Sequence, residues 1–409
     1  MSLIVQKFGG TSVANTERLK NVADIVTKTA QAGNQVVVVV SAQGDTTDDL
    51  IVKAAELNDR PSKREMDVLL NTGEMISMSL LAMAIQKLGF PVVSLTGWQI
   101  GLETNSNYSD ARIKRIAGER LKAELDNGRI VIVAGFQGIN QMGDVTTLGR
   151  GGSDTTAVAI AATLGADLCQ IYTDVDGVYT ADPRIVKHAR KIDTITYKEL
   201  RELSYMGASV LHEDSIFPVY QAAIPINVRN TNDPKEPGTM IVPTIEGDED
   251  GRVTGIAGKK HFTVLTIEKN GMNAELGFGR RVLASIEKYS IPFEHMPSSI
   301  DTLSVVLEDS LVKDNINDII DDIHRVCEPD SVEVVGHIAL IATVGRSMVN
   351  RIGTAATLFS ALADAGVNVR MIDQGSSEMN IIVGVSNDDF ERAINAIHDA
   401  FAGKEERER

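Results

Sequence analysis

Short apolar runs alternate with longer amphipathic stretches over roughly the first 243 residues of the chain. A short run rich in Val and Ile predicts a buried strand, and an amphipathic stretch between two such runs predicts a crossover helix. The alternation therefore predicts a mostly parallel sheet sandwiched by helices. The expected strands lie at 3–8, 35–40, 92–95, 130–133, 168–172 and 225–228.

Beyond this region the pattern repeats itself. Gly277 aligns with Gly353 (353 − 277 = 76), and the same offset aligns the apolar runs 264–267 and 340–343. Each copy reads strand, helix, strand, strand, helix, which predicts a small ferredoxin-like module with a four-stranded sheet and two helices. The acidic, glycine-flanked stretch 247–251 marks a change of domain before the first copy. The expected domains are 1–245, 262–336 and 337–409.

Charge and cysteine content narrow the function classes. The chain has 56 acidic and 40 basic residues and a formal net charge of -16, which disfavours nucleic acid and anionic membrane surfaces as partners. Cys169 and Cys327 form neither a disulfide framework nor a metal-ligand spacing, and they favour a reducing compartment. No leader pattern and no run long enough to span a membrane is expected. We expect a cytoplasmic protein without a metal site of its own.

The first apolar run ends in a candidate phosphate-binding turn. Lys7 stands near its end, and Gly9 and Gly10 follow. Backbone N–H groups at a glycine turn can approach an anion closely, and a helix opening near residues 11–16 would add the positive end of its dipole. An ordinary strand, turn and helix cap with an exposed lysine has the same pattern and remains the alternative.

Two further segments carry polar groups that would reach the same sheet edge. Residues 41–48 follow the second apolar run, and ligands of open α/β sheets bind at the carboxyl ends of strands. The alternative is a turn in which Thr47 or Asp48 caps a helix. Glu74 follows Gly73 within a helical pattern, where its carboxylate could hold an ammonium group or could be an exposed helix charge.

The stretch 149–154, Gly-Arg-Gly-Gly-Ser-Asp, precedes an alanine-rich helical pattern. The arginine fork matches a carboxylate, and the helix start supplies N–H donors, whereas Asp154 as a helix cap is the alternative. Position 154 is not Gly, so the dinucleotide fingerprint fails, and no Walker A lysine follows a glycine-rich loop. The sequence therefore argues against a Rossmann dehydrogenase and against a P-loop kinase.

The stretch 172–184 offers a nucleotide pocket. Its three aspartates suggest a calcium loop, but the helix-loop-helix context and the closing glutamate are absent from the sequence. Turn residues can instead contact an adenine and a ribose, with Tyr179 as an aromatic wall and Arg184 as a charge for phosphate.

Four motifs, at 7–12, 149–154, 172–184 and 203–208, together resemble the aspartate kinase family in its monofunctional form. The resemblance spans the whole chain, because the repeated modules are similar to the ACT-domain pair of that family. It implies an α/β amino-acid-kinase-type sheet sandwiched by helices, followed by two ferredoxin-like ACT regulatory modules. It also implies ATP-dependent phosphorylation of the β-carboxylate of L-aspartate to 4-phospho-L-aspartate, the first step of lysine, threonine and methionine biosynthesis, with Mg²⁺ arriving with ATP.

The resemblance assigns roles to residues of this sequence. Lys7 would neutralise the transferred phosphoryl group, with Asp154 orienting it, and a carboxylate nucleophile needs no general base. Glu74 would hold the ammonium group of aspartate and Arg150 its α-carboxylate. The implied aspartate-binding residues are Ser41, Thr47, Glu74, Arg150, Gly152 and Ser153. The implied ATP-binding residues are Lys7, Gly9, Gly10, Thr173, Asp174, Tyr179, Asp182, Arg184 and Gly207.

One position departs from the family pattern. Some members carry a lysine near the nucleotide phosphates where this sequence has Asn232, and whether Lys235 takes its place is open. The family also implies that the ACT modules interlock within and between subunits of a homodimer or a dimer of dimers, and that the strand at 250–261 belongs with the second module.

ACT pairs of this family usually bind an end-product amino acid at a dimer interface. We expect lysine, with threonine as the second candidate, and Glu294 could meet the side-chain ammonium of lysine or be an exposed glutamate. The candidate effector residues are Met272, Gly277, Phe278, Glu294, Ser298 and Ser299 in the first module and Asn368, Gln374 and Asn380 in the second.

Two other classes of function remain open at this point. A kinase of acetylglutamate or glutamate shares the phosphate-binding turn. It would lack Thr47, Glu74 and Arg150 as the residues that hold a free α-amino acid, and it normally lacks twin ACT modules. A non-catalytic amino-acid sensor would keep ACT modules beside a decayed kinase region, whereas Lys7, Asp154 and both glycine loops are present.

Overall fold

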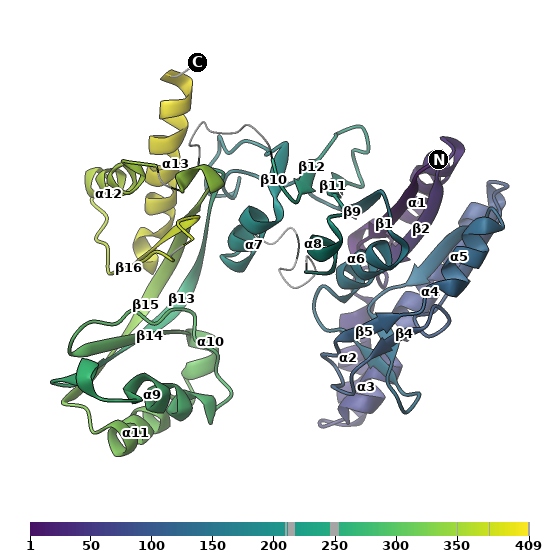
Figure 1. Cartoon of the computed structure of the whole chain (residues 1–409). Coiled ribbons are helices and arrows are strands. Elements are labelled where there is room, and N and C mark those ends of the chain that lie inside the picture. The colour runs from purple at the N-terminus through teal and green to yellow at the C-terminus, as the bar shows by residue number, and fades with distance from the viewer. Residues whose placement is uncertain (209–210, 212–216, 246–252, 350, 376, 408–409) are drawn as a thin grey trace. The chain divides into compact units, whose positions relative to one another are not determined.

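The computed structural model describes residues 1–208, 211, 217–245, 253–349, 351–375 and 377–407 (Figure 1). They form two compact units. The first comprises Met1–Tyr179, Lys191–Tyr205 and Ser209–Gly247, and the second comprises Thr180–Arg190, Met206–Ala208 and Asp248–Arg409. The sequence placed 180–190 in the first domain, but Ala181 and Val186 of this segment lie in a core of the second unit, which explains the difference. The expected boundary at 247–251 lies outside the described residues.

An eight-stranded sheet forms the centre of the first unit. The sequence-predicted runs all form strands in it, and neighbouring strands are parallel except β11 and β12, so β10 and β12 run opposite to the rest. The predicted mostly parallel sheet is thereby confirmed. In sheet order the strands are β10 (Thr194–Thr196), β12 (Thr239–Val242), β11 (Ile226–Asn230), β9 (Leu168–Thr173), β1 (Leu3–Phe8), β2 (Gln35–Val40), β6 (Ile130–Ala134) and β3 (Val92–Leu95).

Helices cover both faces of this sheet, because alternate residues of each buried strand point to opposite sides. Val36, Val38 and Val40 pack against α1 (Thr16–Gln31) and α4 (Thr72–Lys87). On the other face, α6 (Gly152–Leu164) contacts β1, β2 and β9. The remaining helices of the unit are α2 (Thr46–Leu57), α3 (Lys63–Leu70), α5 (Glu119–Asp126), α7 (Tyr197–Tyr205) and α8 (Phe217–Ala222).

A second, four-stranded sheet in this unit was not predicted. Its strands are only three or four residues long, too short for an alternating pattern to stand out. In sheet order they are β5 (Ile113–Ile116), β4 (Leu102–Thr104), β7 (Gln137–Ile139) and β8 (Val145–Thr147).

One helical stretch among the described residues, Lys63–Lys87, is long and apolar enough to cross a membrane by length and composition. The expectation that no stretch reaches this length is therefore wrong. The stretch is apolar because α4 supplies Met78, Leu81 and Ile85 to the core under the sheet.

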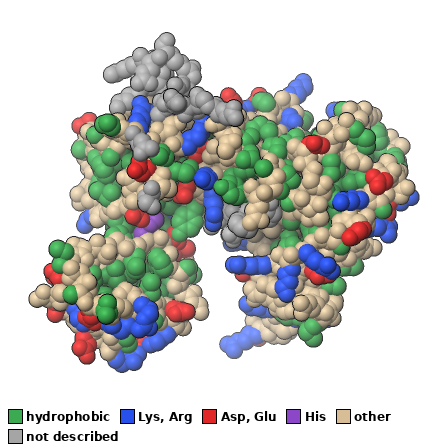
Figure 2. Space-filling view, in the orientation of Figure 1, with side chains coloured by type: hydrophobic (Ala, Val, Ile, Leu, Met, Phe, Trp, Pro, Cys, Tyr) green, Lys and Arg blue, Asp and Glu red, His purple; other side chains and the backbone are tan. Residues whose placement is uncertain are grey.

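Figure 2 shows Lys and Arg side chains interspersed with Asp and Glu over the face in view.

Among the described residues, the second unit contains one five-stranded antiparallel sheet rather than the two four-stranded sheets expected. Two strands of 14 residues each, β13 and β15, run through both ACT modules, and residues 255–259 of β13 pair with 340–344 of β15. The continuous pair of strands hydrogen-bonds backbone N–H and C=O groups that two separate sheets would leave unpaired at their edges. In sheet order the strands are β14 (Thr302–Glu308), β13 (Gly255–Glu268), β15 (Ser331–Val344), β17 (Asn380–Ser386) and β16 (Met371–Asp373).

The backbone confirms the 76-residue repeat. His261 and His337, where β13 and β15 change register or bend, both have positive φ, as do Gly277 and Gly353 just before a helix. Each module has its own apolar core, one around Leu265 and Val305 and the other around Ile341 and Val383. The helices of the unit are α9 (Phe278–Glu287), α10 (Asp309–Val312), α11 (Ile316–Cys327), α12 (Thr354–Asp364) and α13 (Phe390–Arg407).

Candidate active site

A cavity of about 300 Å³ lies in the first unit, where strands of the parallel sheet end. The turns after β1, β2 and β6 and the start of α6 contribute to its wall, as expected for ligand sites of open α/β sheets. The lining residues are Lys7, Gly10, Ser41, Ala42, Gly44, Thr47, Glu74, Phe136, Gly149, Gly151, Gly152, Ser153 and Asp154.

Lys7 and Asp154 form an ion pair at this cavity, with 2.7 Å between Nζ and Oδ1. Strand alternation directs Lys7 away from the face of Phe8 and toward α6, and Asp154 lies in the first turn of that helix. Gly151, in the left-handed conformation with φ +67, is the N-cap of α6, so Asp154 is not its cap. Both side chains are mostly buried, which fixes the lysine charge in place.

Glu74 brings a buried carboxylate to the same cavity. Its Oε1 accepts a hydrogen bond of 3.0 Å from the backbone N–H of Ala42, whereas its buried Oε2 has no hydrogen-bond partner. Burial raises the pKa of the Glu74 carboxyl to about 7. Gly73 permits this placement, because a Cβ there would lie 2.8 Å from the Cβ of Ala42.

The two glycines after Lys7 differ in what they contact. Gly10 lines the cavity, and a Cβ on it would lie 2.9 Å from the carbonyl oxygen of Ala42. Gly9 does not line the cavity, and its backbone N–H donates to the carbonyl of Tyr172 at 3.3 Å. Gly10 is therefore the glycine that the structure brings to the candidate site.

Of the other candidate aspartate-binding residues, four line the cavity and one does not. Ser41, Thr47, Gly152 and Ser153 line the cavity, and α2 begins at Thr46 with Asp45 as its N-cap, so neither Thr47 nor Asp48 caps that helix. Arg150 is exposed and does not line the cavity, although glycines on both sides of it do.

The candidate nucleotide residues also fall into two groups. Thr173 and Asp174 stand at the end of β9. The Tyr179 hydroxyl lies 3.4 Å from a carboxylate oxygen of Asp176. The pKa of Tyr179 is raised, mainly because of burial. The remaining candidates, Asp182, Arg184 and Gly207, belong to the second unit, where Asp182 and Arg184 pair with each other at 2.7 Å.

The structure adds residues that the sequence did not reveal. Phe136 lines the cavity with an unusual positive φ of 67°. Arg18 of α1 donates from its guanidinium to the side chain of Asn232, the position that departs from the family pattern, while Lys235 is exposed. Only the fold brings Arg18 and Asn232 together, so no local signal identifies this pair.

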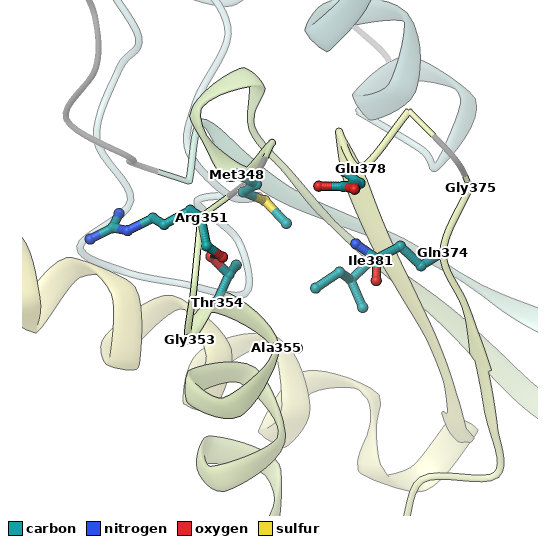
Figure 3. Close-up of a pocket in the computed structure, with 9 residues that line it drawn as sticks. All are labelled: Met348, Arg351, Gly353, Thr354, Ala355, Gln374, Gly375, Glu378 and Ile381. Carbon is teal, nitrogen blue, oxygen red and sulfur yellow. Dashed lines mark hydrogen bonds between the residues drawn. The ribbon is translucent and has the colours of Figure 1, made fainter.

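The second unit contains a pocket of about 420 Å³ in the second ACT module. Figure 3 shows Glu378 and Gln374 at this pocket, with the guanidinium of Arg351 extending away from Gln374. Of the candidate effector residues only Gln374 lines it. The lining residues are Met348, Arg351, Gly353, Thr354, Ala355, Gln374, Gly375, Glu378 and Ile381.

The other effector candidates do not form a described cavity. Met272 and Phe278 are buried in the core of the first module, and Gly277 is the N-cap of α9. The rest are half-buried or exposed, namely Glu294, Ser298, Ser299, Asn368 and Asn380.

The fold and the site together define an amino acid kinase with a regulatory region attached. Residues 2–230 match the amino acid kinase family, and residues 341–401 match the ACT domain. Aspartokinase 2 of Bacillus subtilis (strain 168) is 41% identical over 407 residues, covering 98% of this chain and 98% of that protein. The chain belongs to the aspartokinase family, and it is therefore an ATP-using aspartate kinase with an allosteric ACT region.

Solved structures agree with this assignment. The aspartate kinase of Clostridium acetobutylicum, described as an allosteric enzyme, has a TM-score of 0.84 at 37% identity and covers 97% of this chain and 100% of its own. Aspartokinase III of E. coli is 26% identical and is known in two complexes. The complex with aspartate and ADP (R-state) has a TM-score of 0.83, with 98% and 100% of the chains covered. The complex with lysine and aspartate (T-state) has a TM-score of 0.78, with 98% and 99% covered.

Proposed function

We propose that this chain transfers the γ-phosphoryl group of ATP to the β-carboxylate of L-aspartate, giving 4-phospho-L-aspartate at the start of lysine, threonine and methionine biosynthesis. The observation that carries the proposal is one cavity holding both the Lys7–Asp154 ion pair and the unpartnered Oε2 of Glu74. A lysine and a buried carboxyl group with an unpartnered oxygen, in one small cavity, suit a substrate that carries a carboxylate and an ammonium group.

The chemistry requires charge stabilisation rather than a base. A β-carboxylate oxygen forms the new bond to phosphorus, the bond from phosphorus to the β-phosphate oxygen breaks, and ADP leaves with that electron pair. Lys7 neutralises the phosphoryl oxygens, and Asp154 keeps Nζ within 2.7 Å of its carboxylate, so that the charge stays at the cavity. Mg²⁺ arrives with ATP and neutralises phosphate charge.

Aspartate binds through its ammonium group at Glu74, whose Oε2 gains the partner that it lacks without substrate. Ser41, Thr47, Gly152 and Ser153 line its path, and the exposed Arg150 side chain turns inward to its α-carboxylate. For the nucleotide we propose Lys7, Gly9 and Gly10 at the phosphates. Its other ligands are Thr173, Asp174, Tyr179, Asp182, Arg184 and Gly207.

Hydroxamate formation from ATP and an acceptor in the presence of hydroxylamine tests the proposal. We expect product with L-aspartate and little with glutamate, N-acetylglutamate or N-acetylaspartate, since the last keeps both carboxylates but loses the ammonium group. Equal turnover of N-acetylaspartate would contradict the role of Glu74. Preference for N-acetylglutamate would contradict the substrate assignment.

For regulation we propose that lysine binds the ACT region and favours an inactive state by a few kcal/mol of coupling, with threonine as the second candidate. The lysine-bound T-state of E. coli aspartokinase III supports this choice. The site draws on the first-module candidates and on Asn368, Gln374 and Asn380, in a cytoplasmic homodimer or dimer of dimers. The hydroxamate assay with lysine, threonine and both together tests it, and indifference to all three would contradict it.

A further inference from the structure

We propose that the second unit contains a binding site for a divalent transition-metal ion of the zinc class, formed by His188, His398 and Asp399. The ligand-type atoms of these three side chains all lie within 4.8 Å of one another. His188 Nε2 is 2.7 Å from Asp399 Oδ1, and the two imidazole rings meet edge to face with centroids 5.0 Å apart. Two imidazoles and one carboxylate form a ligand set that zinc, nickel and copper ions favour.

Two segments far apart in sequence hold these groups, and packing fixes both. His188 lies in residues 180–190, which place Ala181 and Val186 in the same apolar core as Ile394 and Ile397 of α13. The side-chain amide of Asn395 also donates to the backbone carbonyl of Ile185 at 3.3 Å. The two ligand-bearing segments are thus held together by contacts outside the proposed site, and the ligands are brought together before any ion binds.

The surroundings of the three groups also suit a metal ion. Thr180 Oγ1 lies 3.0 Å from Nε2 of His398, and a polar partner of this kind commonly sets the ring orientation of a metal-binding histidine. His398 is buried, whereas His188 and Asp399 are more than half exposed and leave a path for an ion from solvent. The charge of -16 also favours cations in general.

The change needed on binding is small. Donor atoms around a tetrahedral ion at about 2.0–2.1 Å lie roughly 3.4 Å apart. The present spread of up to 4.8 Å closes by turning the exposed His188 and Asp399 side chains about their own bonds. Three protein ligands leave a fourth position for water, and the bound ion would join residues 180–190 to α13.

Metal titration of the full chain tests this proposal. The protein is stripped with a chelator, desalted and titrated with Zn²⁺ against a chromogenic competitor, and Co²⁺ is added in parallel for its visible absorption. We expect one tight equivalent per chain, a cobalt spectrum typical of nitrogen and oxygen ligands, and a higher thermal unfolding midpoint with Zn²⁺, because an ion that binds only the folded state stabilises it.

Matched variants separate this site from general surface binding. His188→Gln and Asp399→Asn alter exposed side chains and should weaken Zn²⁺ binding about tenfold or more and reduce the thermal shift accordingly. His337→Gln should change neither, although His337 also faces a carboxylate, Asp388, at 3.1 Å. Unchanged Zn²⁺ binding in His188→Gln and Asp399→Asn, or equal loss in His337→Gln, would overturn the proposal and leave His188–Asp399 as a hydrogen-bonded pair only.

Discussion

At the scale of single residues, burial of the Glu74 carboxyl group has a cost in stability, which the proposed contact with the ammonium group of aspartate would offset. In the ligand-free chain its buried carboxyl has a pKa of about 7, raised from 4.5, so the folded state holds a proton that the unfolded chain has lost between these pH values. The free energy of unfolding should therefore fall by about 3 kcal/mol as the pH rises from about 4.5 to above 7. Urea unfolding of the ligand-free chain at pH 5 and pH 8 measures this change.

The matched comparison is between two glutamates. Glu74→Gln should lose that part of the pH dependence, because an amide carries no charge to desolvate. Glu56→Gln alters an exposed residue of α2 and should keep the full wild-type slope. A Glu74→Gln variant with the wild-type slope would show that the titrating group lies elsewhere.

Lys7 provides the positive charge of the cavity. Lys7→Ala removes this charge, and if Lys7 neutralises the transferred phosphoryl group as proposed, we expect kcat to fall by about 10²–10³. Steady-state kinetics with saturating aspartate and ATP measures this loss. Lys20→Ala, at an exposed position of α1, is the control and should retain full turnover. Full turnover by Lys7→Ala would contradict the catalytic assignment.

Arg18 offers a cation beside Asn232, the position where some family members carry a lysine. Its guanidinium is bonded to Asn232, so we expect Arg18→Gln to raise the KM for ATP about tenfold, the loss expected for one charge-assisted contact to phosphate. The KM for aspartate should stay within twofold. Lys235→Gln decides between the two cations, because a larger effect there would assign the phosphate contact to Lys235.

The candidate site shows what single residues reveal before a structure exists. Lys7, Thr47 and Asp154 could be predicted because strand ends and helix starts of a parallel sheet converge at one edge. Arg18 and Phe136 could not, because their positions depend on contacts between distant segments. Arg150 shows a third case, since the sequence identifies the residue but not the direction of its side chain.

At the scale of elements, close packing between α4 and the turn after β2 positions Glu74. Gly73→Ala would force a Cβ to within 2.8 Å of the Ala42 Cβ, and we expect a loss of about 1–3 kcal/mol in the free energy of unfolding and a higher KM for aspartate. Chemical unfolding and steady-state kinetics measure the two effects.

Gly279→Ala is the matched control for this substitution. Gly279 lies within α9, and a Cβ there meets nothing within 4 Å, so alanine should stabilise the helix by up to about 1 kcal/mol. If Gly73→Ala were as harmless as Gly279→Ala, the close approach would not position Glu74.

Strands that carry an apolar run were predictable, including the four-residue β3, whereas the short strands of the second sheet were not. The buried strands β2 and β6 carry nearly continuous apolar runs, which is why their bounds were close to those predicted. The strands of the four-stranded sheet leave no such pattern. The joining of two modules through β13 and β15 escaped prediction because each half of these strands looks complete by itself.

At the scale of the whole molecule, the shared strands predict that the two ACT modules unfold together. Ile341→Ala, a buried change in the second module, should lower the hydrogen-exchange protection of amides in both modules, including that of Val305. The reason is that β15 contributes Ile341 to one core and Val332 to the other. Val334→Ala, in the same strand but 43% exposed, should leave that protection nearly unchanged. Loss of protection confined to the second module would contradict a single cooperative unit.

The same pair of strands limits how this regulatory region can be cut or exchanged. In a fragment that stops at residue 336, residues 255–259 lose their hydrogen-bonding partners, because those partners lie at 340–344. A fragment that starts at 337 leaves that same ladder without its other half. Chimeras that graft the effector response of a relative onto this kinase should therefore exchange residues 253–409 as one block, and should keep residues 180–190 matched to it, since they pack into its core.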